Sequence, residues 1–523
     1  MKQQYKTSLP LIVVLCVIAG IYLGKNYSSQ SVDFSLFNSS KSEKKLTQLL
    51  DYVDNYYVEP VEKERLVEKA INAITSELDP HSSYISAEEL DAYTDPLEGS
   101  FSGIGVEFMV FEDTVNILKV VPNGPSEKAG LKAGDKLLKA DSTKIAGVNL
   151  SNREIISYLK GATGSIVNVK LVRNNSDTLT LPITRGTVEI ESVNKLSVID
   201  DVAYIKILRF SKNTDTEFFE ELNRAKARGI NKVVIDLRNN GGGYLQSATA
   251  ICEKLLDKGD LIVYTQGKAR PKREYFAEGS DEYNNMKFAI LINAQSASAS
   301  EILAGAFQDN DKATIIGTRS FGKGLVQEQL ELAGKSAIRL TVAKYYTPSG
   351  RCIQRPYLNQ DGEHLSDLEY NFQDLDSIET DTTKFFTKNG RVVYGGGGIV
   401  PDIKVDEFER FDNNGNYWFD DMYQDGSLQQ LCFKFGLEQS WDNFEDFDAN
   451  FSAEKDFKPF LRQQRPDIRF NNTFGADVSR YIKYFIANKL YEDSLSNLLL
   501  LRSDKIFLEA TNPELWEEEE ILN

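Results

Sequence analysis

Apolar residues recur along this chain with three different spacings, and each spacing predicts a different kind of structure. Between residues 45 and 78 the spacing is helical, and Pro60 separates two predicted helices. From about residue 101 to residue 187, short apolar runs alternate with glycine-rich turns, which indicates a small β-rich domain. After residue 202, strand-like apolar runs alternate with helical segments, so we predict an α/β domain.

The α/β region is the part in which we expect the chemistry. The predicted strands cover residues 202–207, 232–237, 261–265, 288–292 and 314–317, and the predicted helices cover residues 215–228, 245–256 and 301–308. Loops rich in glycine and polar residues follow three of these strands, at residues 236–243, 296–301 and 318–324. Active sites in such sheets lie at the strand ends, so these loops are the candidates.

The N-terminus has the pattern of an export signal. An apolar run from Leu9 to Leu23 follows Lys2 and Lys6, and no convincing small-x-small cleavage site ends it. We therefore expect an uncleaved signal anchor over residues 1–26, followed by a polar tether over residues 27–43. The catalytic part would then face the periplasmic side of an inner membrane in the cell envelope, or be secreted if the signal is cleaved.

The loop at residues 296–301 reads Ser-Ala-Ser-Ala-Ser-Glu and lies where a predicted strand turns into a predicted helix. Ser298, followed three residues later by Glu301, has the form of a helix capping box. A serine here has its hydroxyl at the positive end of a helix dipole, beside backbone N–H groups that can bind an oxyanion. The same pattern also fits ordinary capping and packing residues, so the rest of the chain must decide between the two interpretations.

A serine nucleophile needs a general base, and the chain contains only two histidines. His81 follows a helix-breaking Asp-Pro pair, which favours a structural role, and His364 lies in a polar turn. A lysine can act as the base instead if burial lowers its pKa from about 10.4 toward neutrality. Lys323 fits this requirement, because the small neighbours Gly322 and Gly324 let other backbone approach and exclude water.

Residues 317–323 also allow a competing interpretation. They read Gly-x-x-x-x-Gly-Lys, one residue short of a Walker A phosphate loop. Gly324 stands where that loop needs a serine or threonine for Mg²⁺, and residues 325–330 predict a strand where it needs a helix. The pattern therefore speaks against nucleotide binding, while a solvated lysine in a turn remains the simplest alternative.

Several motifs, in order along the chain, resemble the carboxyl-terminal processing peptidases, the tail-specific proteases of family S41. They lie at residues 236–243, 293–302, 321–327, 345–351 and 397–403. The resemblance implies a crotonase-like α/β serine-protease core in which Ser298 is the nucleophile and Lys323 is the general base. It makes Gln327 the residue that orients the lysine, and an i, i+4 spacing in extended chain would place the two side chains on one face.

The same resemblance implies the donors of an oxyanion hole. These are the backbone N–H of Ala299 and the N–H of a glycine in the triple-glycine loop, with Gly242 as the first choice and Gly243 as the second. No cofactor and no metal ion are implied.

The β-rich region, residues 99–188, resembles a PDZ domain. The Ala-Gly-Leu-x-x-Gly-Asp piece at residues 129–135 is a specific part of that pattern. The resemblance implies that a loop formed by Gly103, Ile104, Gly105 and Val106 binds a terminal carboxylate and that the adjacent strand edge takes up a peptide by β-augmentation. The alternative is a small β domain with glycine-dependent turns and no ligand.

Composition sets the remaining limits. The formal net charge of −18 over 523 residues, without a concentrated basic face, excludes a nucleic-acid partner. The cysteines have neither disulfide nor metal-site spacing. The organisation we predict adds a helical region at residues 44–98, the protease core at residues 189–406 and an acidic, largely helical extension at residues 407–523. The N-terminal helices could mediate a homodimer, as the family resemblance allows.

Two functions follow from these patterns. The first is a membrane-anchored envelope serine endopeptidase with a Ser-Lys dyad, acting on proteins with exposed, apolar C-terminal tails. The alternative is a membrane-tethered PDZ adaptor whose protease-like domain is inactive.

Overall fold

The computed structural model describes residues 40–111, 113–174, 177–357, 383–405, 414–439, 441–470, 472–491 and 493–517. The predicted signal anchor, most of the tether and His364 lie outside these ranges. The chain divides into two compact units, Met1–Thr75 and Ser76–Asn523. Among the helices described in this way, none combines the length and the apolar character that a membrane span requires.

The described part of the first unit is helical, as the apolar spacing predicts. It contains α2 (Lys41–Tyr56) and the start of α3 (Lys63–Ser76). A capping box of Ser40 and Glu43 begins α2, and no residue of α2 is buried.

A six-stranded sheet forms the centre of the second unit, in the order β10-β11-β12-β15-β16-β21. Strands β11 to β21 of this sheet run parallel, and β10 pairs antiparallel with β11 at one edge. The strands span Ser197–Ile199 (β10), Val202–Lys206 (β11), Lys232–Asp236 (β12), Lys287–Ile292 (β15), Ala313–Gly317 (β16) and Ile403–Lys404 (β21). The parallel pairing explains the continuous apolar runs, because both faces of these strands are buried.

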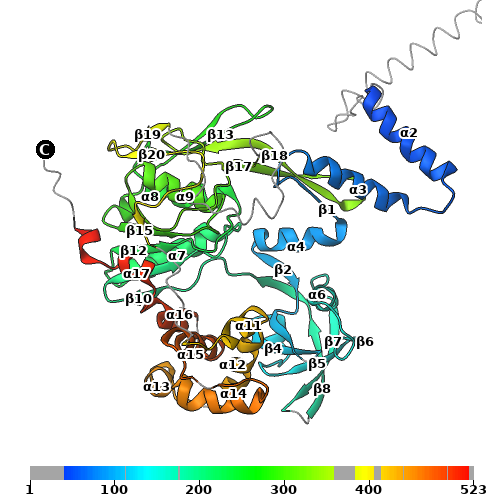
Figure 1. Cartoon of the computed structure of the whole chain (residues 1–523), viewed down its shortest axis with the longest axis vertical. Helices are drawn as coiled ribbons and strands as arrows, with labels where there is room; N and C mark the ends of the chain where they lie inside the picture. Colours follow the sequence, from blue (N-terminus) through cyan, green and yellow to red (C-terminus); the bar gives the residue numbers. More distant parts are fainter. Residues whose placement is uncertain are drawn as a thin grey trace, which may run out of the picture. The chain divides into compact units, whose positions relative to one another are not determined.

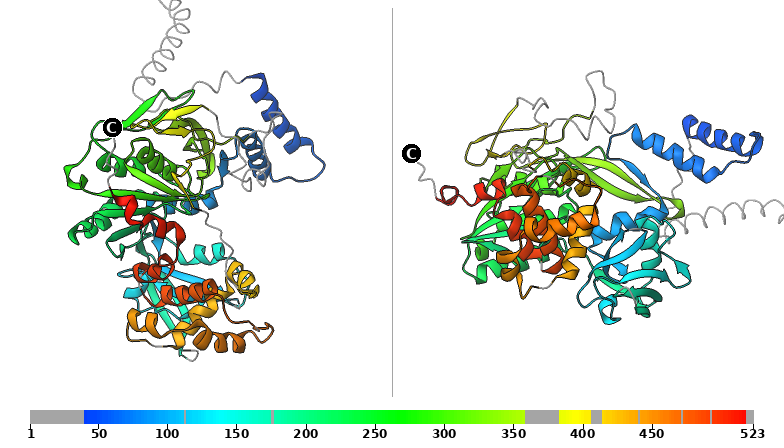
Figure 2. Two further views of the ribbon diagram at one scale, coloured as in Figure 1. Left: turned by 60° about the vertical axis from the view of Figure 1, so that its left-hand side comes forward. Right: turned by 60° about the horizontal axis from the view of Figure 1, so that its bottom comes forward.

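Helices cover the two faces of this sheet. Helices α7 (Thr214–Ala227), α8 (Leu245–Leu255) and α9 (Ala299–Asp309) pack on one face, and α17 (Lys505–Ala510) with η6 (Pro513–Trp516) packs on the other. Successive side chains of a strand point to opposite faces, so Val233 and Ile235 belong to the first core while Val234 belongs to the second. Figure 1 shows β12 and β15 between α8 and α9 on one side and α17 on the other, and Figure 2 gives two further views of these elements.

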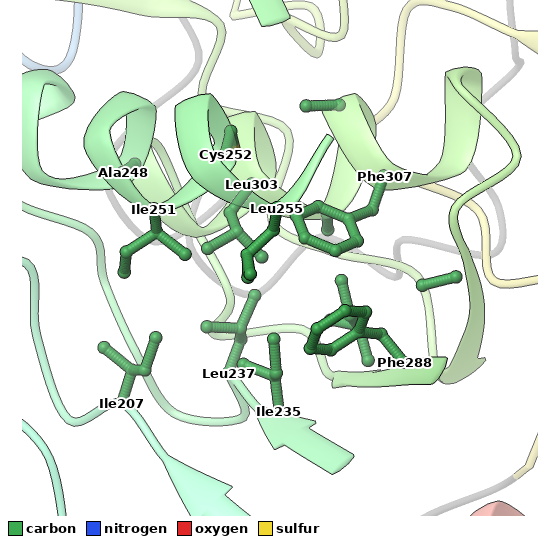
Figure 3. Close-up of a cluster of buried hydrophobic side chains, with 14 of the residues drawn as sticks. Ile207, Ile235, Leu237, Ala248, Ile251, Cys252, Leu255, Phe288, Leu303 and Phe307 are labelled. Atoms are coloured by element: carbon green, nitrogen blue, oxygen red, sulfur yellow. The ribbon is translucent and has the colours of Figure 1, made fainter. Parts of the chain in front are cut away.

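The larger core lies between the sheet and the three helices α7, α8 and α9 (Figure 3). Ile235 and Phe288 of the sheet face Ile251 and Leu255 of α8 and Phe307 of α9, and all five side chains are buried. Burial of an apolar side chain of this size contributes about 1.5–3 kcal/mol. This packing fixes the position of α9, whose N-terminus carries the candidate nucleophile.

A second, antiparallel sheet has the order β1-β18-β13-β14, with β17 also paired to β18. Its strands are Ser83–Ile85 (β1), Leu261–Gln266 (β13), Arg273–Phe276 (β14), Leu325–Glu331 (β17) and Ala337–Tyr346 (β18). The strand predicted at residues 261–265 therefore exists, but it was wrong to include it among the strands of the α/β sheet. Its partners are β14 and β18, with Tyr264 opposite Tyr346 of β18, and a pairing between strands as distant as β13 and β18 leaves no periodic signal in the sequence.

The β-rich region forms a separate six-stranded antiparallel sheet in the order β3-β4-β5-β7-β8, with β6 paired to β5. Its elements are Val106–Phe111 (β3), Thr114–Val120 (β4), Pro125–Lys128 (α5), Lys136–Ala140 (β5), Thr143–Lys144 (β6), Asn152–Leu159 (α6), Ile166–Arg173 (β7) and Asp177–Thr184 (β8). A two-stranded sheet of β2 (Ser100–Gly103) and β9 (Gly186–Glu189) flanks it, and α4 (Ala87–Glu98) precedes it. Strand β3 is an edge strand.

Helices with an aromatic core make up most of the C-terminal region. They are Trp418–Gln424 (α11), Ser427–Glu438 (α12), Phe444–Asn450 (α13), Ala453–Phe457 (η5), Lys458–Gln464 (α14), Ala476–Leu490 (α15) and Asp493–Leu501 (α16). The helices expected at residues 478–490 and 495–501 are confirmed as α15 and α16. The short remaining elements are Asp281–Tyr283 (η2), Ala333–Lys335 (η3), Lys384–Phe386 (β19) and Val392–Tyr394 (β20).

Candidate active site

Three loops meet at the carboxyl ends of neighbouring parallel strands. Strands β12, β15 and β16 are adjacent in the sheet, and they lead into the glycine loop (residues 236–243), the serine loop (residues 293–301) and the lysine loop (residues 318–324). The sequence predicts these loops at strand ends, and the strand order brings the ends together.

Ser298 lies at the turn between β15 and α9 with an unusual backbone conformation. Its φ is 56° and its ψ is −113°, in a region that residues other than glycine rarely adopt. Of the three serines in the loop, Ser296 and Ser300 are fully buried, whereas Ser298 is partly exposed. A substrate can therefore reach Ser298 alone among them.

The other two serines join the serine loop to the glycine loop. The hydroxyl of Ser296 donates to the carbonyl oxygen of Leu237 at 2.8 Å, and the hydroxyl of Ser300 donates to that of Asn240 at 2.9 Å. The N–H of Ala297 also donates to the Asn240 carbonyl at 3.0 Å. Structural roles for Ser296 and Ser300 follow directly from these contacts.

Glu301 is a buried carboxylate that connects the serine loop and the lysine loop. Its Oε2 accepts the N–H of Ser298 and the N–H of Lys323, each at 2.9 Å. Its Oε1 accepts the hydroxyl of Ser320 at 2.5 Å and the N–H of Gly322 at 2.7 Å. Burial raises the pKa of Glu301, and these four donors oppose the rise. The two backbone nitrogens that share Oε2 lie within 5.8 Å of each other.

Tyr345 of β18 connects the same two residues from another side. Its hydroxyl lies 2.7 Å from the carbonyl oxygen of Lys323 and 3.2 Å from that of Ser298. Burial raises its pKa well above the ordinary value, so the hydroxyl stays protonated and can donate. Glu301 and Tyr345 together fix Ser298 and Lys323 through both their N–H and their C=O groups.

Lys323 has the environment that a lysine base requires. Burial lowers its pKa to about 8, and the charge of Arg339 adds to this effect, while Asp79 and Glu301 oppose it. Its Nζ donates to Oε1 of Gln327 at 2.7 Å, and Gln327 lies four residues further along the chain, in β17. The contact predicted from the i, i+4 spacing is thus present.

Gln327 is itself held by the turn that contains His81. Its Nε2 donates to the backbone carbonyl of His81 at 2.5 Å. Burial, together with the charge of Lys323, lowers the pKa of His81 to about 4, so the imidazole is neutral at neutral pH. The N–H of His81 donates to Asp79 at 2.9 Å, which anchors the turn. These contacts agree with a structural role for His81.

The two candidate oxyanion donors in the glycine loop differ in their hydrogen bonding. The N–H of Gly242 donates to the side chain of Asn240 at 2.9 Å, and Gly242 is buried. Gly243 is exposed, and within the described ranges neither its N–H nor that of Ala299 has an acceptor. Gly242 lies against Ser298, because a Cβ added there would be 2.8 Å from Cβ of Ser298.

The Walker A interpretation fails on the structure as well as on the sequence. The segment after Lys323 is strand β17, whereas a phosphate loop must lead into a helix. Among the residues that the structure describes, no group of three or more His, Cys, Asp or Glu side chains is placed to hold a metal ion.

The predicted carboxylate-binding loop lies between β2 and β3. Gly103 ends β2, Val106 begins β3, and Ile104 and Gly105 connect them. Gly105 has a φ of 73°, and its carbonyl accepts the N–H of Val121 at 3.1 Å. The carbonyl of Ile104 accepts the N–H of Ser126 at 2.9 Å. No described strand pairs with the outer edge of β3, so this edge has the geometry that β-augmentation needs.

Two functional residues were missed or only partly understood from the sequence. Glu301 was expected to cap the helix, and its contacts with the lysine loop were not foreseen. Tyr345 lies in one of the recognised motifs, but no role was predicted for it. Presence in a motif was the signal available for both residues, because their contacts with Ser298 and Lys323 join segments that are distant in the sequence.

Comparison with known proteins identifies the family. The profile of peptidase family S41 matches residues 201–364, and the profile of the PDZ domain matches residues 102–184. A carboxy-terminal-processing protease of Bartonella bacilliformis is 33% identical over 349 residues, which are 65% of this chain and 80% of that protein. The chain belongs to peptidase family S41. It is an S41 serine protease of the carboxy-terminal processing type, with a PDZ domain and a mixed α/β fold.

Other relatives of this S41 peptidase cover different parts of it. The carboxy-terminal processing protease CtpB of Bacillus subtilis is 32% identical over 64% of this chain and 72% of that protein. A probable CtpA-like serine protease of Staphylococcus saprophyticus is 30% identical over 94% of this chain and 92% of that protein. The solved structure of a photosystem II D1 C-terminal processing protease is 28% identical over 70% of this chain and 87% of that chain, with a TM-score of 0.36.

Proposed function

We propose that this S41 peptidase uses Ser298 and Lys323 as a Ser-Lys dyad to cleave proteins whose C-terminal tails it binds through its PDZ domain. One observation carries the proposal: the carboxylate of Glu301 accepts the N–H groups of both residues, while burial lowers the pKa of Lys323 to about 8. A lysine with this pKa is partly neutral near pH 7 and can accept a proton.

In the first half of the reaction, Oγ of Ser298 attacks the peptide carbonyl carbon while neutral Nζ of Lys323 accepts the hydroxyl proton. Lys323 then gives this proton to the leaving amine, the C–N bond breaks and an acyl-enzyme remains. In the second half, Lys323 accepts a proton from water, whose oxygen attacks the ester carbonyl. The proton returns to Ser298 as the ester bond breaks. Gln327 keeps Nζ in place throughout.

For the oxyanion we favour the N–H groups of Ala299 and Gly243. Both are without an acceptor in the described structure, and Ala299 is the first residue of α9, where the helix dipole adds to the field. Gly242, the first choice from the family resemblance, already donates its N–H to Asn240. We assign Gly242 the role of allowing the glycine loop to approach Ser298.

A cleavage assay tests the dyad. The full-length chain should degrade a test protein that has a flexible apolar C-terminal tail, and Ser298→Ala and Lys323→Ala should each lower the rate by at least about 10³-fold. Lys323→Arg is the matched control for charge, because arginine keeps the positive charge but cannot give up its proton, and it should be equally inactive. Undiminished cleavage by any of the three variants contradicts the proposal. If the wild type binds the tail peptide and produces no fragment, the PDZ adaptor is the correct alternative.

We also infer a membrane tether and a location in the cell envelope, because the basic residues Lys2 and Lys6 precede the apolar run from Leu9 to Leu23. Fractionation of cells that express the full-length chain tests this, and recovery in the cytosol contradicts it.

For the N-terminal helices we infer a second copy of the chain as partner, since α2 leaves Leu49, Tyr52 and Tyr56 between 57% and 80% exposed. Leu49→Glu should then shift the sedimentation of the protein from dimer to monomer.

A further inference from the structure

A buried ionic cluster lies directly before the glycine loop. Asp236, the last residue of β12, is fully buried and accepts the hydroxyl of Tyr204 at 2.6 Å. The guanidinium of Arg238 approaches Asp236 with Nη2 at 2.7 Å and Nε at 3.0 Å. Burial opposes ionisation of Asp236, but the charges of Arg238 and Lys206 hold its pKa well below the usual range. The cluster is therefore ionised and well bonded.

The second partner of Arg238 comes from the C-terminal extension. Nη1 of Arg238 donates to Oδ1 of Asp504 at 3.0 Å, and Nη2 lies 2.6 Å from Oδ2. This is the two-pronged geometry in which a guanidinium and a carboxylate bind most strongly. The two residues are 266 positions apart in the sequence, and Asp504 lies beyond residues 201–364, the region that the S41 profile covers.

Asp504 is also fixed within the C-terminal segment by its contacts with α17. Its Oδ1 also accepts the N–H groups of Ile506 and Phe507, each at 3.1 Å, and so caps α17. Phe507 is fully buried and packs edge-on against Tyr204, with ring centroids 5.5 Å apart. The cap and the packing fix the carboxylate relative to the sheet, and the carboxylate in turn fixes the guanidinium of Arg238.

From Arg238 a short series of hydrogen bonds leads to the reacting groups. Asn239 has a φ of 61°, and its N–H donates to the side chain of Asn293 at 3.0 Å. Asn240 accepts the N–H of Ala297 at 3.0 Å, and its side chain accepts the N–H of Gly242 at 2.9 Å. The backbone between Arg238 and Gly243 thus has few ways to move without moving the serine loop.

We propose that Asp504 is a positioning residue of the active site: through Arg238 it sets the glycine loop so that the N–H of Gly243 points to the oxyanion. The C-terminal extension then serves catalysis directly, besides covering the sheet. This inference rests on the proposed function, since it requires that the glycine loop bind the oxyanion at Ser298. An orientation change of this kind affects the transition state more than substrate binding.

Asp504→Asn separates the positioning role from the structural one. Asparagine caps a helix as well as aspartate does, so α17 and its packing should remain. The charge that pairs with Arg238 is lost, and Arg238 keeps Asp236 as a partner, so no buried charge is left alone. We expect kcat of the full-length chain to fall by about 10- to 100-fold with KM changed less than about twofold. Affinity for a peptide boronic acid, which mimics the tetrahedral state at Ser298, should fall in parallel, and binding of the tail peptide should not change.

Two further variants make the outcomes decisive. Lys287→Met removes the 2.6 Å bond from Nζ of Lys287 to the carbonyl of Trp516, another attachment of the same segment, and should lower the unfolding temperature without changing kcat. Asp504→Glu keeps the charge and should retain more kcat than Asp504→Asn. If the wild type cleaves and Asp504→Asn retains full kcat and boronic acid affinity, the inference is wrong and the dyad stands. If Ser298→Ala cleaves as fast as the wild type, the proposed function fails and this inference fails with it.

Discussion

At the scale of single residues, the proposed mechanism depends on a lysine that can lose its proton near neutral pH. Burial lowers the pKa of Lys323 to about 8, while Gln327 and its contact with the His81 carbonyl hold the amine in place. The partner of the ammonium group is thus a neutral amide and not a carboxylate, and a carboxylate at this distance would raise the pKa again. If Lys323 is the general base, as we propose, a change of residue 327 from an amide to a carboxylate should alter the pH at which the enzyme works.

The pH profile of the wild type follows from this. Only the neutral form of Lys323 can accept the proton of Ser298, so kcat/KM should rise about tenfold per pH unit below pH 8 and level off above it. Gln327→Glu places a carboxylate at the position of the amide, which favours the charged lysine and should move the midpoint upward by about one pH unit or more. Steady-state cleavage between pH 6 and pH 10 measures both midpoints.

Glu328→Gln is the matched control for this experiment. Glu328 is adjacent in the sequence but pairs with Arg270, with Nη2 of Arg270 2.6 Å from its carboxylate, so its side chain is engaged elsewhere. Glu328→Gln exchanges the same two side-chain types in the reverse direction, one position along the chain, and does not touch Lys323, so the midpoint should stay near pH 8. A profile that is flat from pH 6 to pH 9, or one that Gln327→Glu does not move, would contradict the role of Lys323 as base.

Residue chemistry was the part of the site most open to prediction. Ser298 and Lys323 were candidates because the chain has few histidines and because the motifs resemble a known family. The family resemblance made Gln327 the residue that orients Lys323, and the i, i+4 spacing was consistent with their contact. Glu301 and Tyr345 could not be given their roles in the same way, because each reaches the other loop only after β15, β16 and β18 have packed together.

At the scale of elements, the site depends on how closely two loops can approach. The glycine loop after β12 and the serine loop after β15 are joined by the hydroxyls of Ser296 and Ser300, and Gly242 lies directly against Ala297 and Ser298. The strands and helices that support these loops were predictable from apolar periodicity. Strand β13 was placed in the wrong sheet, because periodicity says nothing about which strand will be its partner.

Gly242→Ala should therefore damage catalysis through backbone displacement. The new Cβ would lie 2.7 Å from the carbonyl oxygen of Ala297 and 2.8 Å from Cβ of Ser298, and the φ of 98° is strained for alanine. We expect kcat to fall about 100-fold and the free energy of unfolding to fall by about 1–3 kcal/mol. Gly241→Ala is the control, since a Cβ there meets nothing within 4 Å, and it should behave as the wild type. Equal activity of the two variants would show that the loops can separate without loss.

At the scale of the whole chain, the C-terminal region illustrates what the sequence could not supply. It was predicted to be helical, and it is, but its sequence contains no recognisable chemistry. The structure separates it into the aromatic cluster of α11 to α16 and the segment of α17 and η6, which completes the core on the second face of the sheet. Only the folded chain brings Asp504 to Arg238, because a contact across 266 positions leaves no local pattern.

The PDZ domain allows the last test, because it should affect substrate capture and leave the chemistry unchanged. Gly105 lies in the predicted carboxylate-binding loop, directly before the edge strand β3. Its φ of 73° is strained for alanine, and an added Cβ would lie 3.1 Å from Cγ2 of Val188, so alanine should disturb the packing of this loop against Val188. Gly105→Ala should raise KM for a tailed protein about tenfold or more, with kcat unchanged, and should not alter cleavage of a short peptide without a tail. Gly164→Ala is a control in the same domain with a φ of 85° and no neighbour within 4 Å, so it reproduces the backbone strain without displacing the loop. If both variants raise KM equally, the loop has no special role in capture. If Gly105→Ala lowers kcat for the short peptide as well, the PDZ domain acts on the catalytic loops and not only on the tail.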